Sequence, residues 1–95
     1  MAIRVLVKRK FSEDKAEALR ELTGKMRVLA MGQSGYVSGE TLARIDRPGM
    51  SLVISKWKSR TAWENWYRTP ERKKMQKRID ELLGEETEYE IYDYD

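Results

Sequence analysis

Aromatic and polar side chains that could support chemistry cluster between residues 57 and 72. They are Trp57, Trp63, Asn65, Trp66, Tyr67 and Arg72. Aromatic rings can wall a ligand pocket, although buried aromatic residues most often only pack. Trp63 and Trp66 are three residues apart on a predicted helix, so we expect one to anchor the core and the other to border a cavity. Trp66 is the leading candidate for the cavity.

Two polar side chains of this cluster could act on a bound ligand. Tyr67 follows Trp63 by four residues, so the two rings can stack along a helix, and its phenol could donate a proton. Arg72 could hold a phenolate or a carboxylate, because a guanidinium offers donors in a fixed geometry. The alternatives are that Tyr67 only packs and that Arg72 lies at the surface.

Composition excludes many other kinds of chemistry. The chain has 95 residues, with 19 Lys and Arg, 16 Asp and Glu, and neither His nor Cys. Without His and Cys there can be no Ser-His-Asp or Cys-His catalytic arrangement, no disulfide and no His or Cys metal ligand. The acidic residues lack the spacing of a metal site. We therefore expect no bound metal.

Length and hydropathy predict a single domain over residues 1–95. No apolar run approaches the roughly 18–20 residues that a membrane span needs, so no membrane contact is expected. Residues 1–11 mix four basic side chains into the apolar positions, unlike the uninterrupted apolar region of a signal peptide. A cytoplasmic location is therefore expected.

Hydrophobic periodicity predicts the elements that must position these side chains. In order, they are a strand over 2–10, a helix capped by Ser12 and ending at Gly32, strands over 36–45 and 50–57, helices over 60–68 and 70–83, and a strand over 86–93. Ser59 and Thr69 are predicted helix N-caps, Pro70 suits a first helical position, and Gly84 is a helix stop. Gly39 suggests a bulge in the second strand.

This order of elements predicts an α+β, ferredoxin-like βαββαβ protomer with a four-stranded antiparallel sheet and helices on one face. In that topology the last strand lies beside the first. Glu88 and Glu90 would then face the bases Arg4, Lys8 and Arg9, and opposite charges across strands contribute about 0.2–1 kcal/mol per pair. The concentration of acids after residue 84 thus has an intramolecular explanation.

The sheet face without helices is expected to expose apolar groups. The expected residues are Leu6, Val53, Trp57 and either Tyr36 or Tyr92. A contiguous apolar patch on a small protein usually marks an interaction surface. The simplest partner is a second copy related by a two-fold axis, so a homodimer is predicted. The alternative is a scattered, tolerated set of apolar residues.

The basic run over 72–78 could indicate nucleic-acid binding. A ferredoxin-like sheet that binds RNA, however, stacks bases on aromatic residues central in its first and third strands. The first strand here has no aromatic residue, and the third has only Trp57 at its end. We therefore interpret the run as a solvated helix face and expect no nucleic-acid partner.

The stretch from Ser55 to Trp66, followed by Thr69, Pro70 and Glu71, resembles the antibiotic biosynthesis monooxygenase family. The resemblance implies a ferredoxin-like protomer that forms a dimeric α/β barrel. It also implies an oxygenase that acts without metal, flavin or nicotinamide on an electron-rich aromatic or quinol substrate. Trp66 matches the helix tryptophan that lines the family's pocket, whereas Trp57 and Trp63 match positions that more often pack.

The same resemblance, taken branch by branch within the family, implies which residues form the site. In the heme-degrading branch a His ligates iron about ten residues after the pocket tryptophan, but Gln76 stands here, so heme degradation is not expected. The quinone-forming branch implies catalytic roles for Trp66, Tyr67 and Asn65. Substrate contacts would come from Trp57, Trp63 and Arg72, with no cofactor. The alternative is a non-catalytic dimer of the same fold that binds a small ligand or is purely structural.

Overall fold

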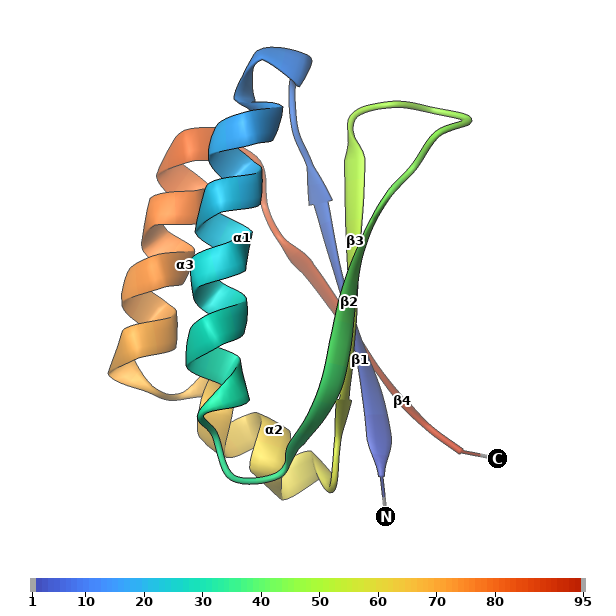
Figure 1. Cartoon of the computed structure of the whole chain (residues 1–95), viewed down its shortest axis with the longest axis vertical. Coiled ribbons are helices and arrows are strands. Elements are labelled where there is room, and N and C mark those ends of the chain that lie inside the picture. The colour runs from blue at the N-terminus through green and yellow to red at the C-terminus, as the bar shows by residue number, and fades with distance from the viewer. Residues whose placement is uncertain (1, 95) are drawn as a thin grey trace.

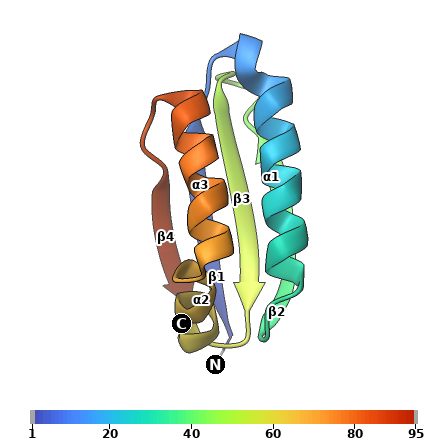
Figure 2. The same cartoon turned by 90° about the vertical axis from the view of Figure 1, so that its left-hand side faces the viewer.

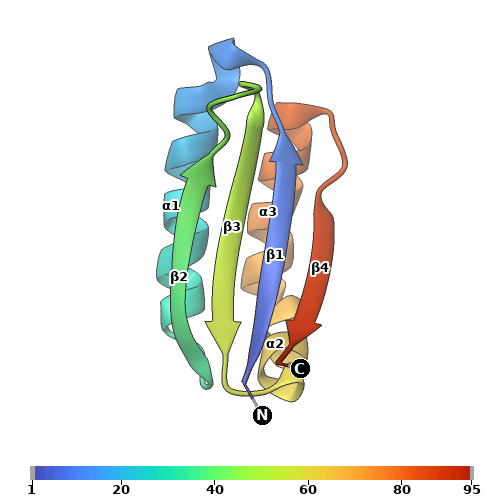
Figure 3. The ribbon, with the colours of Figure 1, turned by 90° about the vertical axis from the view of Figure 1, so that its right-hand side faces the viewer.

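The sheet and the helices form two layers (Figure 1) in the computed structural model, which describes residues 2–94. The strands are β1 (Ile3–Lys10), β2 (Tyr36–Ala43), β3 (Met50–Trp57) and β4 (Glu88–Asp93). They are antiparallel, in the order β2-β3-β1-β4, as Figure 3 shows. The predicted ferredoxin-like arrangement is therefore confirmed, including β4 beside β1.

The helices lie on one face of the sheet. They are a short 3-10 helix η1 (Glu13–Lys15), α1 (Ala16–Met31), α2 (Arg60–Tyr67) and α3 (Pro70–Leu83). Figure 2 shows α1 and α3 side by side along the strands, with α2 at the end where α3 begins. Within residues 2–94, no helix combines the length and the apolar character that crossing a bilayer requires.

Side-chain caps set the helix boundaries around α2 and α3. Ser59 Oγ accepts a hydrogen bond from the Ala62 amide at 3.1 Å, and Thr69 Oγ1 accepts one from the Arg72 amide at 3.2 Å. Pro70 occupies the first turn of α3, and Gly84 ends this helix in the left-handed region at φ 63°. All of these predictions are confirmed, because each depends only on local backbone chemistry.

Two local predictions differ from the structure. Ser12 makes no side-chain capping bond, and a turn of 3-10 helix precedes α1. The irregularity in β2 lies between Tyr36 and Ser38 rather than at Gly39, which pairs with Ser55. A Cβ atom at Gly39 would lie 2.6 Å from the hydroxyl oxygen of Tyr36, so a larger residue there would displace the end of the Tyr36 side chain.

The register of β1 and β3 corrects the expected outer face of the sheet. Ile3 lies opposite Trp57 and Val7 lies opposite Val53, so all four face the helices. Alternation predicts which residues of one strand share a face, but not which faces of two strands coincide. The prediction that Val53 and Trp57 are on the outer face is therefore wrong.

The outer face is nevertheless partly apolar. Tyr92 lies opposite Arg4 on that face, whereas Tyr36 lies opposite Trp57 and faces the helices. The outer apolar residues, hereafter the outer patch, are Leu6, Leu42, Leu52, Ile54 and Tyr92. Leu42 and Tyr92 are 44% and 51% exposed.

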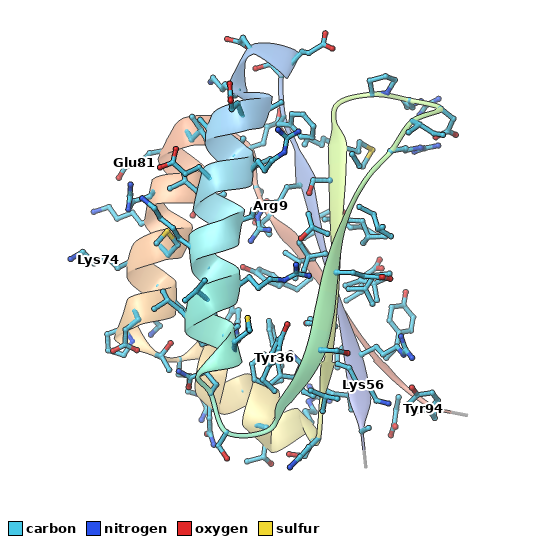
Figure 4. All side chains as sticks on the ribbon, in the orientation of Figure 1. Arg9, Tyr36, Lys56, Lys74, Glu81 and Tyr94 are labelled. Atoms are coloured by element: carbon cyan, nitrogen blue, oxygen red, sulfur yellow. The ribbon has the colours of Figure 1, made fainter. Side chains whose placement is uncertain are left out.

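Among the described residues, only one of the predicted ion pairs between β1 and β4 is present. Lys8 Nζ lies 3.0 Å from the Glu90 carboxylate, which raises the pKa of Lys8 and lowers the pKa of Glu90. Arg4 donates to the hydroxyl of Tyr94 instead, at 3.1 Å. Arg9 lies on the same face as Val7 and points into the molecule, as Figure 4 shows.

Candidate functional site

A cavity of about 70 Å³ lies between the sheet and the helix layer. Its aromatic lining residues are Tyr36, Trp57, Trp63, Trp66 and Tyr89. Its polar lining residues are Arg9, Thr23, Arg27, Thr41, Ser55 and Arg72. Figure 4 shows Arg9 between α1 and the sheet, with Tyr36 closer to α2.

The aromatic wall is tightly interlocked. The rings of Trp57 and Trp66 are stacked, with an interplanar angle of 22° and centroids 6.3 Å apart. Trp63 and Tyr36 each present an edge to Trp57, at centroid distances of 5.8 Å and 5.3 Å. The buried indole nitrogen of Trp57 donates to Ser55 Oγ at 3.1 Å, so the polar atom of this ring is satisfied.

A hydrogen-bond network joins two buried arginines across the cavity. Arg9 Nη2 and the Tyr89 hydroxyl both donate to Gln76 Oε1, at 3.1 Å and 3.2 Å. Arg72 Nη1 donates to the Tyr89 hydroxyl at 3.0 Å, and Arg72 Nε donates to the Tyr67 carbonyl at 2.8 Å. The Arg72 guanidinium also lies 4.2 Å from the ring centroid of Tyr67, a cation–π distance.

The site is electrostatically positive. Its lining, drawn from residues 2–94, contains three arginines and no Asp or Glu. Burial lowers the pKa of Arg9, and the nearby charge of Arg72 lowers this pKa further. Burial also raises the pKa of the Tyr89 phenol, an effect that outweighs the opposing pull of Arg72 and Arg9. At neutral pH the site thus holds a neutral phenol beside guanidinium groups, which stay charged because arginine does not lose its proton in proteins.

These groups define what the cavity can do chemically. The indole rings offer an apolar surface to a flat ligand, and the guanidinium groups can stabilise negative charge on it. The Tyr89 phenol can donate or accept a hydrogen bond. In the part of the chain that the structure describes, no group of three His, Cys, Asp or Glu side chains is placed to hold a metal ion.

Comparison with known families identifies the chain. The family model described as antibiotic biosynthesis monooxygenase matches residues 2–78. The chain belongs to the antibiotic biosynthesis monooxygenase family. This confirms the family predicted from the stretch between Ser55 and Glu71.

Solved structures show the same fold. A conserved protein from Methanosarcina mazei Go1 is 21% identical, with 100% of this chain and 94% of that chain covered and a TM-score of 0.91. Rv0793 from Mycobacterium tuberculosis is 19% identical, with coverage of 100% and 96% and a TM-score of 0.87. SnoaB, a cofactor-independent oxygenase from Streptomyces nogalater, is 14% identical, with coverage of 99% and 93% and a TM-score of 0.87. No curated protein matches significantly.

The structure brings four of the six candidate residues of this family member to the cavity. Trp57, Trp63, Trp66 and Arg72 all line it, and all are at least 94% buried. The expectation that only one helix tryptophan borders the cavity is wrong, because Trp63 and Trp66 lie on the same inward face of α2.

The other two candidates lie outside the cavity. Tyr67 is 40% exposed, and its ring lies 4.2 Å from the Arg72 guanidinium. The ring centroids of Tyr67 and Trp63 are 5.7 Å apart, so the predicted contact along the helix is present. Asn65 is exposed on α2 and is not a lining residue.

Sequence reasoning missed three important polar residues. Arg9 continues the alternation of Ile3, Val5 and Val7, so the pattern already places an arginine on the buried face. Tyr89 likewise lies two residues before Ile91 in β4, so the two side chains share a face of the strand. Gln76 lies one helical turn after Arg72 on the buried stripe of α3. The signal in each case is a polar group at a position that the apolar period assigns to the interior.

Proposed function

We propose that the protein is a cofactor-independent monooxygenase that acts on a small, electron-rich aromatic or quinol substrate. The observation that carries this proposal is a cavity in which stacked indole rings face buried guanidinium groups and a neutral phenol. Membership of the family supports the class of reaction, as does the similarity in fold to a cofactor-independent oxygenase.

In this reaction the substrate supplies the electrons that reduce oxygen. A quinol and O₂ would give a hydroxyquinone and water: one oxygen atom bonds to a ring carbon, and the other leaves as water with two hydrogens of the substrate. The ionised ring is the better electron donor, so groups that stabilise its oxyanion favour the reaction. The apolar wall of the site also keeps water away from the reacting ring.

We assign the following roles to the candidate residues that line or adjoin the cavity. Trp66, with Trp57 and Trp63, would form the surface against which the substrate ring lies. Arg72 would hold the anionic oxygen of the substrate. Tyr67 would act as a positioning residue, because its carbonyl and ring hold the Arg72 guanidinium. Tyr89 rather than Tyr67 offers a phenol to the cavity, and the Asn65 amide does not line it.

The proposed assembly is a homodimer formed through the outer patch. The patch lies on the sheet face opposite the helices, and its apolar side chains are surrounded by charged groups such as Lys8 and Lys56. A two-fold pairing of these faces would bury the patch in both copies and produce an α/β barrel.

A second candidate function is non-catalytic binding of a small ligand. The volume of about 70 Å³ favours it, because pockets for drug-sized ligands are typically roughly 300–1,000 Å³. The same tryptophans also belong to the hydrophobic core, which is what purely structural roles would require.

Oxygen uptake with a panel of dihydroxyaromatic compounds tests the proposed reaction. We expect turnover by the wild type and a loss of about 100-fold or more in kcat/KM for Trp66→Ala, because the ring's binding surface is removed. Trp66→Phe keeps an aromatic surface and should retain more activity, which separates loss of the site from loss of the fold. Absence of oxygen uptake with every compound would instead support non-catalytic binding.

A further inference from the structure

We propose that the ligand of this cavity is a single-ring aromatic acid whose carboxylate lies between Arg9 and Arg72. The inference rests on the proposed function, because it assumes that the substrate ring lies against the tryptophan wall. The substrate would then carry a permanent negative charge in addition to its aromatic ring.

The first argument is an excess of buried positive charge. Arg9 and Arg72 are 5% and 6% exposed. Their hydrogen-bond acceptors are all neutral, namely the Gln76 amide oxygen, the Tyr89 hydroxyl and the Tyr67 carbonyl. The nearby Asp80 carboxylate accepts from Gln76 Nε2 rather than from either arginine. Buried charges are normally paired, but no carboxylate of residues 2–94 forms a salt bridge with either arginine.

The second argument is an unused donor. Within residues 2–94, the buried Arg9 Nε has no hydrogen-bond partner. Arg27, by contrast, donates to the Gly39 carbonyl across the α1–β2 side of the cavity. The protein therefore leaves part of the Arg9 guanidinium without a partner, and a carboxylate suits this planar group because it accepts two parallel hydrogen bonds.

A ligand that is always anionic would compensate the buried charges of these arginines, whereas a neutral quinol would not. A quinol hydroxyl ionises only near pH 10, as a phenol does, so a neutral quinol would enter the site without compensating either charge. A carboxylate is ionised at neutral pH and would compensate them as soon as it binds. The cavity volume of about 70 Å³ excludes a ligand with more than one ring.

The test compares ligands of the same shape that differ in charge. Binding of 2,5-dihydroxybenzoate, 2,5-dihydroxybenzamide and hydroquinone is measured by calorimetry and by quenching of tryptophan fluorescence, since all three tryptophans line the cavity. We expect the carboxylate to bind the wild type at least about tenfold more tightly than the amide, as charge-assisted hydrogen bonds require.

Variants assign the preference to the two arginines. Arg9→Met and Arg72→Met should each weaken binding of the carboxylate far more than binding of the amide, and so remove most of the tenfold preference. Arg78→Met is the matched control, because Arg78 is exposed on the same helix as Arg72 and carries the same charge. It should keep the preference. The wild-type comparison alone tests the proposal if either buried variant does not fold.

The outcomes separate this inference from the proposed reaction. Equal affinity for the acid and the amide, or a preference that Arg78→Met also abolishes, would overturn the inference. Oxygen uptake with hydroquinone under those conditions would still support the oxygenase. Preferential binding of the acid without any oxygen uptake would support the anion site and reject the oxygenase.

Discussion

The Tyr89 phenol shows how burial sets the chemistry of one residue in this site. Its hydroxyl accepts a hydrogen bond from Arg72 and donates one to Gln76, while its ring packs 6.0 Å from that of Trp63. Burial raises the pKa of this phenol. The proton therefore remains on Tyr89 at neutral pH, where it can be shared with a bound ligand.

The raised pKa of Tyr89 predicts a change in stability at alkaline pH. The unfolded chain releases this proton near pH 10, whereas the folded chain retains it to higher pH. Tyr89 thus contributes stability below about pH 10 that is lost as pH rises through the folded-state pKa. The difference in unfolding free energy between wild type and Tyr89→Phe, measured with urea, should shift against the wild type between about pH 8 and about pH 11.

Absorbance of tyrosinate provides an independent check. One tyrosine of the wild type should ionise at higher pH than the others, and this late step should be missing from Tyr89→Phe. If both proteins show the same titration curve, the phenol is not shielded from water as the structure indicates.

At the scale of elements, the junction between α2 and α3 places Arg72. Thr69 Oγ1 donates to the Trp66 carbonyl at 2.9 Å and accepts from the Arg72 amide at 3.2 Å. One threonine therefore closes the end of α2 and starts α3. This connection holds the backbone of Trp66 beside the backbone of Arg72.

Removal of this cap should weaken both the fold and the site. Thr69→Ala should lower the free energy of unfolding by about 1 kcal/mol, the usual cost of losing an N-cap side chain. Thr61→Ala is the control, because Thr61 is exposed on α2. Urea denaturation gives the free energy of unfolding of both variants, and an equal loss in the two would show that the cap does not stabilise the junction.

At the scale of the whole molecule, the outer patch is an exposed apolar surface of the kind that a partner protein usually covers. Leu6 and Ile54 lie opposite each other on the two central strands. The helices cover only the other face of the sheet (Figure 1), so a second copy is the simplest cover for these residues.

A charge placed in the outer patch should separate the proposed dimer. We expect light scattering of the wild type at micromolar concentration to give twice the chain mass, and Ile54→Glu to give the monomer mass, because burying a carboxylate at the interface is unfavourable. Val28→Glu is the control, since Val28 is 68% exposed on α1. A monomeric wild type would contradict the proposed assembly.

The amino-acid sequence by itself determined the elements, their order and the fold. Ser59, Thr69, Pro70 and Gly84 act on the backbone within a few residues of themselves, so helix boundaries follow from local chemistry. Alternation in the strands likewise identified Ile3, Val5 and Val7 as one face. The aromatic residues over 57–66 are close together in the chain, so the sequence alone indicates that they form one cluster.

Only the tertiary structure decided which side chains meet. The pairing of Val7 with Val53 depends on the register between two distant segments, and it placed Trp57 in the core rather than on the outer face. The contact between Arg9 and Gln76 joins residues 67 positions apart, and no local pattern specifies it. The positive character of the cavity therefore arises from packing, because it depends on which charges the fold leaves buried together.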